Sequence, residues 1–217
     1  MLARVRDDHE LLQAWRDGDE AAGRELFARH FDATFRFFRA KLPDAAEDLT
    51  QQTFLGCVRG KDRFRGDASF RTYLFTVARN RLYTHLRDRG RRARIEQPAE
   101  PAELSIADLA DPSPSAIIAG RQEQRLLLEA LRRLPLDLQI AIELHYWEGM
   151  TVREIALVVD APEGTIKRRL QRARARLEAI IRELADSDVL ANSTIGDLAG
   201  WARQLQEALS EPVPDGG

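Results

Sequence analysis

The chain has 217 residues but only one cysteine, Cys57. A single cysteine excludes an intramolecular disulfide and a cysteine-based zinc site. The four histidines are scattered without the spacing of metal ligands, so we expect no metal and no cofactor. Cys57 falls on the apolar face of an expected helix, where a small buried thiol is the simplest interpretation.

Long apolar runs are also missing from the sequence. No stretch approaches the roughly 20 apolar residues that a membrane-spanning helix needs. The N-terminal residues MLARVRDDHELL become acidic at once and lack the apolar core of a signal peptide. We therefore expect a cytoplasmic protein with no membrane segment.

Patterns that carry catalytic chemistry are absent as well. The sequence has no glycine-rich phosphate-binding loop, no paired His, Asp and Glu at metal-ligand spacing, and no nucleophile with a plausible base. An enzyme is therefore the least favoured class of function.

The net charge of −2 hides a strong segregation of charge along the chain. Basic residues dominate from Arg59 to Arg94 and again from Lys167 to Arg176. Every charged residue from Ile95 to Gly120 is acidic, and acids dominate again after Glu183. Solvated surface charge could explain either basic block alone. Together, the two blocks favour a polyanionic partner that is contacted at two places.

Helical periodicity dominates the sequence, and no segment alternates convincingly as a strand. In the N-terminal part we expect helices near residues 9–17, 19–41, 43–60 and 69–90. A stretch rich in proline, acids and small residues follows, and it cannot bury enough apolar surface to fold. The expected all-α organisation is two small helical domains at 9–92 and 119–184, a flexible acidic, Pro-containing linker at 93–118 and a C-terminal extension at 185–217.

The most informative segment runs from Thr151 to Arg176. Thr151 and Glu154 form a capping-box pattern at the start of a short helix, and Pro162 suits the first turn of a second helix. That second helix has one apolar stripe, and every charged residue on its remaining surface from Lys167 to Arg176 is basic. Two such helices joined by a tight turn are typical of a DNA-binding helix-turn-helix. An amphipathic hairpin with a solvated basic face is the less favoured alternative. The stripe consists of Ile166, Leu170, Ala173 and Leu177.

Four segments in sequence order resemble the bacterial extracytoplasmic-function (ECF) sigma factors, minimal two-domain proteins that direct RNA polymerase to promoters. The resemblance covers about residues 10–184 and implies a sigma domain 2, a linker and a sigma domain 4 that contains the helix-turn-helix. The segments are Gly18–Phe27, Asp44–Phe54, Asp62–Leu74 with Ala78–Asn80, and the domain 4 pattern Leu134-Pro135, Tyr146–Met150 and Gly164–Lys167.

The resemblance implies that the largest subunits of core RNA polymerase bind the helix that follows Pro43. A solvated acidic face is the alternative interpretation of this helix. The family usually has an acid where Gln52 stands, so this chain has one interface charge fewer. Thr50 and Thr53 lie in the same segment, and phosphorylation there is a hypothesis for adjusting docking. The expected docking residues are Asp44, Glu47, Asp48, Gln51, Gln52 and Leu55.

The resemblance also implies that domain 2 reads and melts the −10 promoter element, with a base-capturing loop near residues 61–69. Aromatic, amide and arginine side chains can stack on an unpaired base, read its edge and hold phosphate. Either Tyr73 or Tyr83 could instead be partly core. The expected −10 residues are Phe64, Arg71, Tyr73, Thr76, Arg79, Asn80, Tyr83 and Arg87.

By the same resemblance, domain 4 reads the −35 element with the entry of its second helix. Lysine and arginine there can contact phosphates alone, which positions the protein without specifying sequence. The expected −35 residues are Glu163, Gly164, Thr165, Lys167, Arg168, Arg169 and Arg172.

Residues Ser193 to Leu209 lie outside the two-domain core of the family. We expect an amphipathic helix there, capped by Thr194 and Asp197. It could pack on domain 4, bind a partner, or fold over the basic DNA-binding surface and restrain it. Its apolar stripe consists of Ile195, Leu198, Trp201, Leu205 and Leu209.

Two functions remain open at this point. The favoured one is a sigma factor with core RNA polymerase and promoter DNA as partners, and an anti-sigma factor as a further candidate partner. The alternative is a helix-turn-helix regulator that binds DNA without joining polymerase. The acidic helix at 44–55 separates the two, because only a sigma factor needs it.

Overall fold

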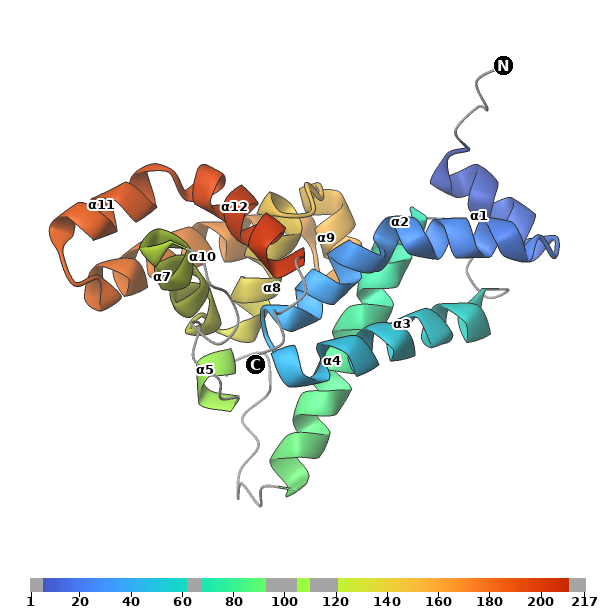
Figure 1. Cartoon of the computed structure of the whole chain (residues 1–217), viewed down its shortest axis with the longest axis horizontal. Coiled ribbons are helices and arrows are strands. Elements are labelled where there is room, and N and C mark those ends of the chain that lie inside the picture. The colour runs from blue at the N-terminus through green and yellow to red at the C-terminus, as the bar shows by residue number, and fades with distance from the viewer. Residues whose placement is uncertain (1–5, 62–67, 93–104, 110–120, 211–217) are drawn as a thin grey trace, which may run out of the picture.

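The computed structural model describes residues 6–61, 68–92, 105–109 and 121–210. Every named element in these ranges is a helix, which confirms the all-α expectation (Figure 1). The only strand-like pairing among them is an isolated bridge between Ser105 and Pro135.

The N-terminal domain contains four helices and a 3-10 turn. Asp7 and Asp19 accept hydrogen bonds from the first-turn amides of the first two helices, which explains where those helices begin. Cys57 is fully buried in the core of this domain, as expected. The elements are α1 (Asp8–Arg16), α2 (Glu20–Arg39), η1 (Pro43–Ala45), α3 (Ala46–Gly60) and α4 (Phe70–Arg92).

The helix-turn-helix domain confirms the expected motif. The Thr151 hydroxyl and the Glu154 side chain satisfy each other's backbone amides at the start of α9, and Asp160 ends that helix in the left-handed region at φ 52°. Pro162 then stands as the N-cap of α10. The elements are α7 (Gln122–Arg132), α8 (Leu136–Tyr146), α9 (Val152–Val159) and α10 (Glu163–Leu184).

The two domains pack directly against each other, which the sequence did not predict. α4 of the N-terminal domain contacts α9 of the helix-turn-helix domain, and one hydrophobic core contains buried side chains from both. Leu82 and Leu86 of α4 lie in this core with Ile155 and Val159 of α9. We call this packed state the closed arrangement.

One turn of the expected linker is ordered against the shared core. It forms the short helix α5 (Ile106–Leu109), and its first residue is fully buried. Composition could not show this, because scattered apolar residues in an acidic, proline-containing stretch give no helical periodicity. Ile106 therefore joins the linker to the closed arrangement.

The C-terminal extension forms two helices where the sequence predicted one, α11 (Asp188–Gly196) and α12 (Leu198–Ser210). Asp197 caps the second helix as expected, because its carboxylate accepts the Gly200 amide at 3.0 Å. The Thr194 cap is wrong, since its buried hydroxyl donates to the Leu190 carbonyl at 2.8 Å inside α11. Ser187 caps α11 instead.

Candidate polymerase and promoter interfaces

The expected docking residues form an exposed, polar face of α3 and the turn before it. The opposite face of α3, including Leu49 and Thr53, is buried in the domain, so the helix has one free side. Gln52 is half-buried and donates to the Asp48 carboxylate at 2.8 Å. The Gln52 side chain, which stands where an acid was expected from the resemblance, thus holds the Asp48 carboxylate in place. The exposed members are Asp44, Glu47, Asp48, Gln51 and Leu55.

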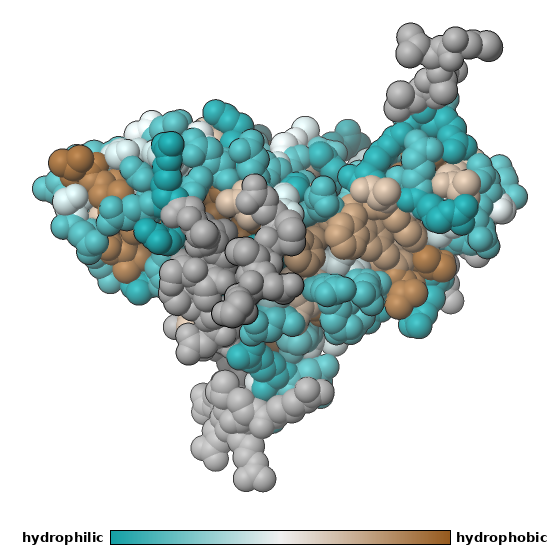
Figure 2. Space-filling model, viewed as in Figure 1, coloured by the Kyte–Doolittle hydropathy of each residue, from teal (hydrophilic) through white to brown (hydrophobic). Residues whose placement is uncertain are grey.

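An apolar surface that the sequence analysis missed adjoins these acids. Leu55 and Val58 of α3 are 53% and 43% exposed, and Phe31 of α2 is 43% exposed. Figure 2 shows the apolar patch between α2 and α3, and a groove there is also lined by Phe27 and Phe54. Exposed apolar patches of this kind mark protein interfaces. We call this patch with the acidic face of α3 the docking face.

Phosphorylation of Thr50 or Thr53 is incompatible with the folded domain. Both residues are fully buried. Their hydroxyls donate to the carbonyls of Ala46 and Leu49, each at 2.7 Å. A phosphate could reach these positions only if α3 unfolded, so the structure contradicts that hypothesis.

Most of the expected −10 residues that the structure describes lie along one side of α4, whereas Arg71 lies on the side of the buried stripe. Asn80 and Arg87 are exposed, and Thr76 is half-buried with its hydroxyl bonded to the Thr72 carbonyl at 2.9 Å. The other side of α4 carries a buried apolar stripe. It consists of Leu74, Phe75, Ala78, Leu82 and Leu86.

The two tyrosines lie at opposite borders of this exposed side. Tyr73 packs toward α3, where a Cβ on Gly60 would lie 2.1 Å from its hydroxyl. Tyr83 packs toward the helix-turn-helix domain beneath the Arg79 guanidinium, which lies 4.6 Å from its ring centroid. Both rings are therefore partly core, which was one of the two expectations.

Arg71, another expected −10 residue, is held by the helix-turn-helix domain. Its Nη1 donates to the Glu148 carbonyl at 2.7 Å, and its Nη2 lies 3.8 Å from the Glu154 carboxylate. Arg71 is thus partnered by protein in the closed arrangement and would have to leave both contacts to meet DNA.

The entry of α10 presents most of the expected −35 residues to solvent. Glu163, Gly164, Lys167, Arg168 and Arg172 are exposed, and Thr165 is half-buried. Positive side chains at the start of a helix that projects from a helix-turn-helix suit the phosphates and base edges of a major groove.

Arg169 differs from the other α10 residues, because its Nε lies 3.0 Å from the Asp137 carboxylate of α8. Burial raises the pKa of the Tyr83 hydroxyl, which also feels the charges of Arg79, Asp137 and Arg169. An expected −35 residue, Arg169, is therefore a neighbour of an expected −10 residue, Tyr83.

Phe64, with most of the expected base-capturing loop, lies outside the described residues. In the described part of the chain, no group of three acidic, histidine or cysteine side chains could hold a metal ion. No helix in those ranges is both long enough and apolar enough to cross a membrane.

Comparisons with known proteins identify the family of both domains. The model of Sigma-70 region 2 matches residues 26–92, and the model of Sigma-70 region 4 matches residues 124–177. The RNA polymerase sigma-H factor of Pseudomonas aeruginosa is 31% identical over 183 residues, which cover 82% of this chain and 95% of that protein. The ECF RNA polymerase sigma-E factor of Escherichia coli is 28% identical over 182 residues, with the same coverage of 82% and 95%.

Solved structures show the same similarity. The sigma factor RpoE of Bartonella quintana, in complex with the anti-sigma factor NepR, has a TM-score of 0.56 and 27% identity over 77% of this chain and 99% of that chain. CnrH in complex with the cytosolic domain of CnrY shares the fold, with a TM-score of 0.58 and 24% identity over 82% of this chain and 99% of that chain.

The chain belongs to the ECF sigma factors. It is a sigma factor that directs promoter recognition by RNA polymerase, and its family is non-enzymatic. The match to region 2 sets aside the alternative of a regulator that never joins polymerase.

Proposed function

We propose that three surfaces divide the work of this sigma factor. The docking face on α2 and α3 binds core polymerase, the side of α4 around Asn80 reads and melts the −10 element, and the entry of α10 reads the −35 element. The observation that carries the proposal is a difference in accessibility. The docking face is exposed, whereas Arg71 and Tyr83 of α4 are packed against the helix-turn-helix domain.

The closed arrangement cannot occupy both promoter elements at once. Positions −35 and −10 are about 25 base pairs apart, or about 85 Å at about 3.4 Å per base pair of B-form DNA. In the closed arrangement α4 contacts α9 directly, and the charge of Arg169 acts on Tyr83. The two domains must therefore separate before both elements can be bound.

Core polymerase is the partner that supports such a separation. It meets a docking face that is already free, and it binds the separated form more tightly if each domain then gains its own site on polymerase. A ligand shifts an equilibrium only through its differential affinity for the two states. On this proposal the protein works in the cytoplasm, and the anti-sigma factors in similar complexes make an anti-sigma factor a candidate partner.

Transcription by purified core polymerase on a library of randomised promoters tests the proposal. We expect transcripts that share one −35 and −10 pair with the protein present and none without it. Asn80→Ala should shift or weaken selection at −10 alone, and Lys167→Ala should act at −35 alone. If both substitutions changed the selected promoter sequences at the same element, the division of work between the surfaces would be contradicted.

A further inference from the structure

Helix α12 contacts both domains. On the helix-turn-helix domain it packs against α7, and on the N-terminal domain it packs against α2. Trp201, Leu205 and Leu209 are buried, and they share a hydrophobic core with α7, α8 and α10. Of the three alternatives for the extension, the structure shows packing on domain 4, and the described part of the extension leaves the basic residues at the entry of α10 exposed.

The end of α12 is fastened to the N-terminal domain by two arginines of α2. Arg39 Nη1 donates to the Leu209 carbonyl and Arg36 Nη1 donates to the Ser210 hydroxyl, both at 2.9 Å. Carbonyls in the last turn of a helix lack intrahelical partners, and cations there complement the helix dipole. Arg39 thus satisfies a carbonyl at the helix end that would otherwise need water, and Arg36 holds the side chain of the last helical residue.

The same helix is fastened to the helix-turn-helix domain. Gln206 Nε2 donates to the Trp147 carbonyl at 3.0 Å, and Gln124 Nε2 donates to Gln204 Oε1 at 3.2 Å. Arg36 also pairs with Glu148 at 3.5 Å, so the contact of α12 with α2 is continuous with the contact between the domains. Separation of the domains must break one of these two sets of bonds to α12.

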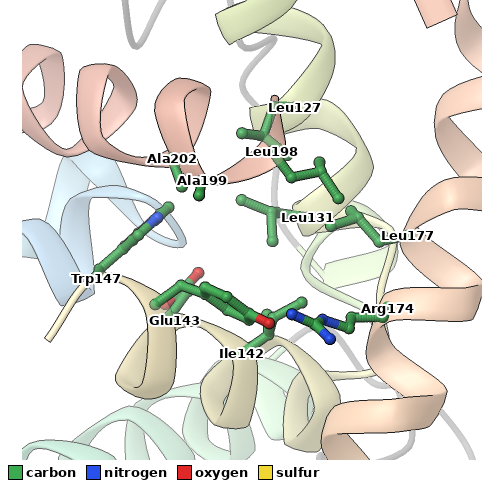
Figure 3. Close-up of a pocket in the computed structure, with 11 residues that line it drawn as sticks. Leu127, Leu131, Ile142, Glu143, Trp147, Arg174, Leu177, Leu198, Ala199 and Ala202 are labelled. Atoms are coloured by element: carbon green, nitrogen blue, oxygen red, sulfur yellow. The ribbon is translucent and has the colours of Figure 1, made fainter. Parts of the chain in front are cut away.

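The seam between α12 and the helix-turn-helix domain is incompletely filled. An apolar pocket of about 110 Å³ lies between α12 and helices α7, α8 and α10 (Figure 3). On the α12 side it is bordered by the small side chains of Ala199 and Ala202 with Leu198. The atoms that line this pocket make fewer protein contacts than those of a close-packed core. A single larger side chain at this pocket can therefore improve the packing of α12 on the helix-turn-helix domain.

We propose that α12 is an intramolecular clasp, a segment that joins α2 to the helix-turn-helix domain and so favours the closed arrangement over the promoter-binding one. The clasp limits promoter recognition until polymerase separates the domains. The link to promoter recognition rests on the proposed function, whereas the effect on domain separation does not.

Two substitutions of opposite sign test the clasp in the full-length protein. Leu205→Ala removes a fully buried side chain from the seam, and Ala202→Leu adds carbon atoms at the pocket. Glu207→Ala, at an exposed position of the same helix, is the matched control. We expect Leu205→Ala to raise the ratio of molecules with separated domains to molecules in the closed arrangement about tenfold, because it weakens the packing of α12. Ala202→Leu should lower the same ratio.

The first readout is the distance between spin labels on the two domains. Labels at Arg24→Cys and Ala175→Cys occupy exposed positions, in a Cys57→Ala background that removes the native thiol. We expect a longer, broader distance distribution for Leu205→Ala and a narrower one for Ala202→Leu. Distributions in all three variants that match the parent would overturn the clasp.

The second readout is open-complex formation at limiting polymerase. We expect an increase with Leu205→Ala and a decrease with Ala202→Leu. If the distances change as expected but open complexes do not, α12 joins the domains without limiting promoter recognition, and that part of the proposal fails. If no variant supports transcription while the distances still respond, the proposed function fails and the clasp stands. A melting curve identifies unfolding of Leu205→Ala, in which case Ala202→Leu decides.

Discussion

Lys41, just after α2, and Glu143 of α8 form an ion pair across the domain boundary in which the two side chains are 0% and 2% exposed. Lys41 Nζ also donates to the Phe37 carbonyl at 2.9 Å, and Gln139 donates to the Glu143 carboxylate at 2.8 Å. Burial lowers the pKa of Lys41 and raises the pKa of Glu143, because each charge has lost its water. This pair exists only while the domains are together.

Removal of one partner should destabilise the closed arrangement more than removal of both. Lys41→Met alone leaves a buried carboxylate without its cation, which typically costs about 3–5 kcal/mol, whereas replacement of a whole buried pair by apolar residues is often neutral. We expect the double variant Lys41→Met/Glu143→Met to unfold at a higher urea concentration than either single variant. Additive losses in the free energy of unfolding would show that the two charges do not act as a pair.

Leu55→Ala should weaken binding to core polymerase several-fold, because Leu55 supplies apolar area at the centre of the docking face. Leu157→Ala is the matched control, since Leu157 of α9 is 50% exposed and Leu55 is 53% exposed. Burial of a whole leucine side chain is worth about 1.5–3 kcal/mol, and docking can bury only the exposed half of Leu55, which corresponds to a several-fold to roughly tenfold change in affinity. Affinity measured with labelled protein checks this, and equal losses in the two variants would argue against the docking face.

Asn80→Ala should reduce open-complex formation about tenfold, because the exposed amide can contact a base edge once the duplex melts. Thr84→Ala changes another exposed residue of α4 and serves as the control. Permanganate footprinting of the −10 region on the cognate promoter measures melting directly. Normal melting by Asn80→Ala would remove this residue from the −10 surface.

Arg172→Ala should weaken binding to the −35 element and make it less sensitive to salt. Each phosphate contact that is lost should reduce the slope of log K against log salt by about 1. Arg133→Ala, an exposed arginine at the end of α7 outside the helix-turn-helix, should leave both quantities unchanged. An unchanged slope for Arg172→Ala would mean that its side chain does not meet a phosphate.

Cys57 should make stability fall with pH in the alkaline range. Burial raises the pKa of its thiol from 9.0 to about 12, so the folded chain keeps a proton that the unfolded chain loses. The contribution of the protonated thiol to the free energy of unfolding is complete below pH 9. It is lost as the pH rises toward 12, by about 1.4 kcal/mol per pH unit. Urea unfolding of the wild type and of Cys57→Ala between pH 8 and 10 isolates this slope. The same burial predicts a thiol that reagents reach only after unfolding.

The sequence predicted individual helices well because their signals are local. The capping box at Thr151 and the apolar stripe of α10 depend only on residues within a few turns. Periodicity shows that one side of a helix is buried, but it does not show what covers that side. The sequence therefore placed α4 and α9 in separate domains and did not show that α9 packs against α4.

Site residues on one helix were predicted from the sequence, whereas contacts between distant helices were not. The acids of α3 were found because they share a helix, whereas Phe31 was missed because it reaches the docking face from α2. The contact of Arg71 with Glu148 and the ion pair of Arg169 with Asp137 join helices that are distant in sequence. No local pattern marks such pairs. The several phenylalanines of α2 were the sequence signal for the apolar part of the docking face, because one side of a helix cannot bury all of them.

The docking face is accessible while the domains are together, and this has a kinetic consequence. Polymerase can associate with the closed chain at first encounter, so the bimolecular association rate constant should not depend on how tightly α12 holds the domains. A later, unimolecular step that is independent of polymerase concentration should carry that dependence. The slow step of holoenzyme assembly would then be set within the sigma factor itself, and its rate could differ among relatives that dock equally fast.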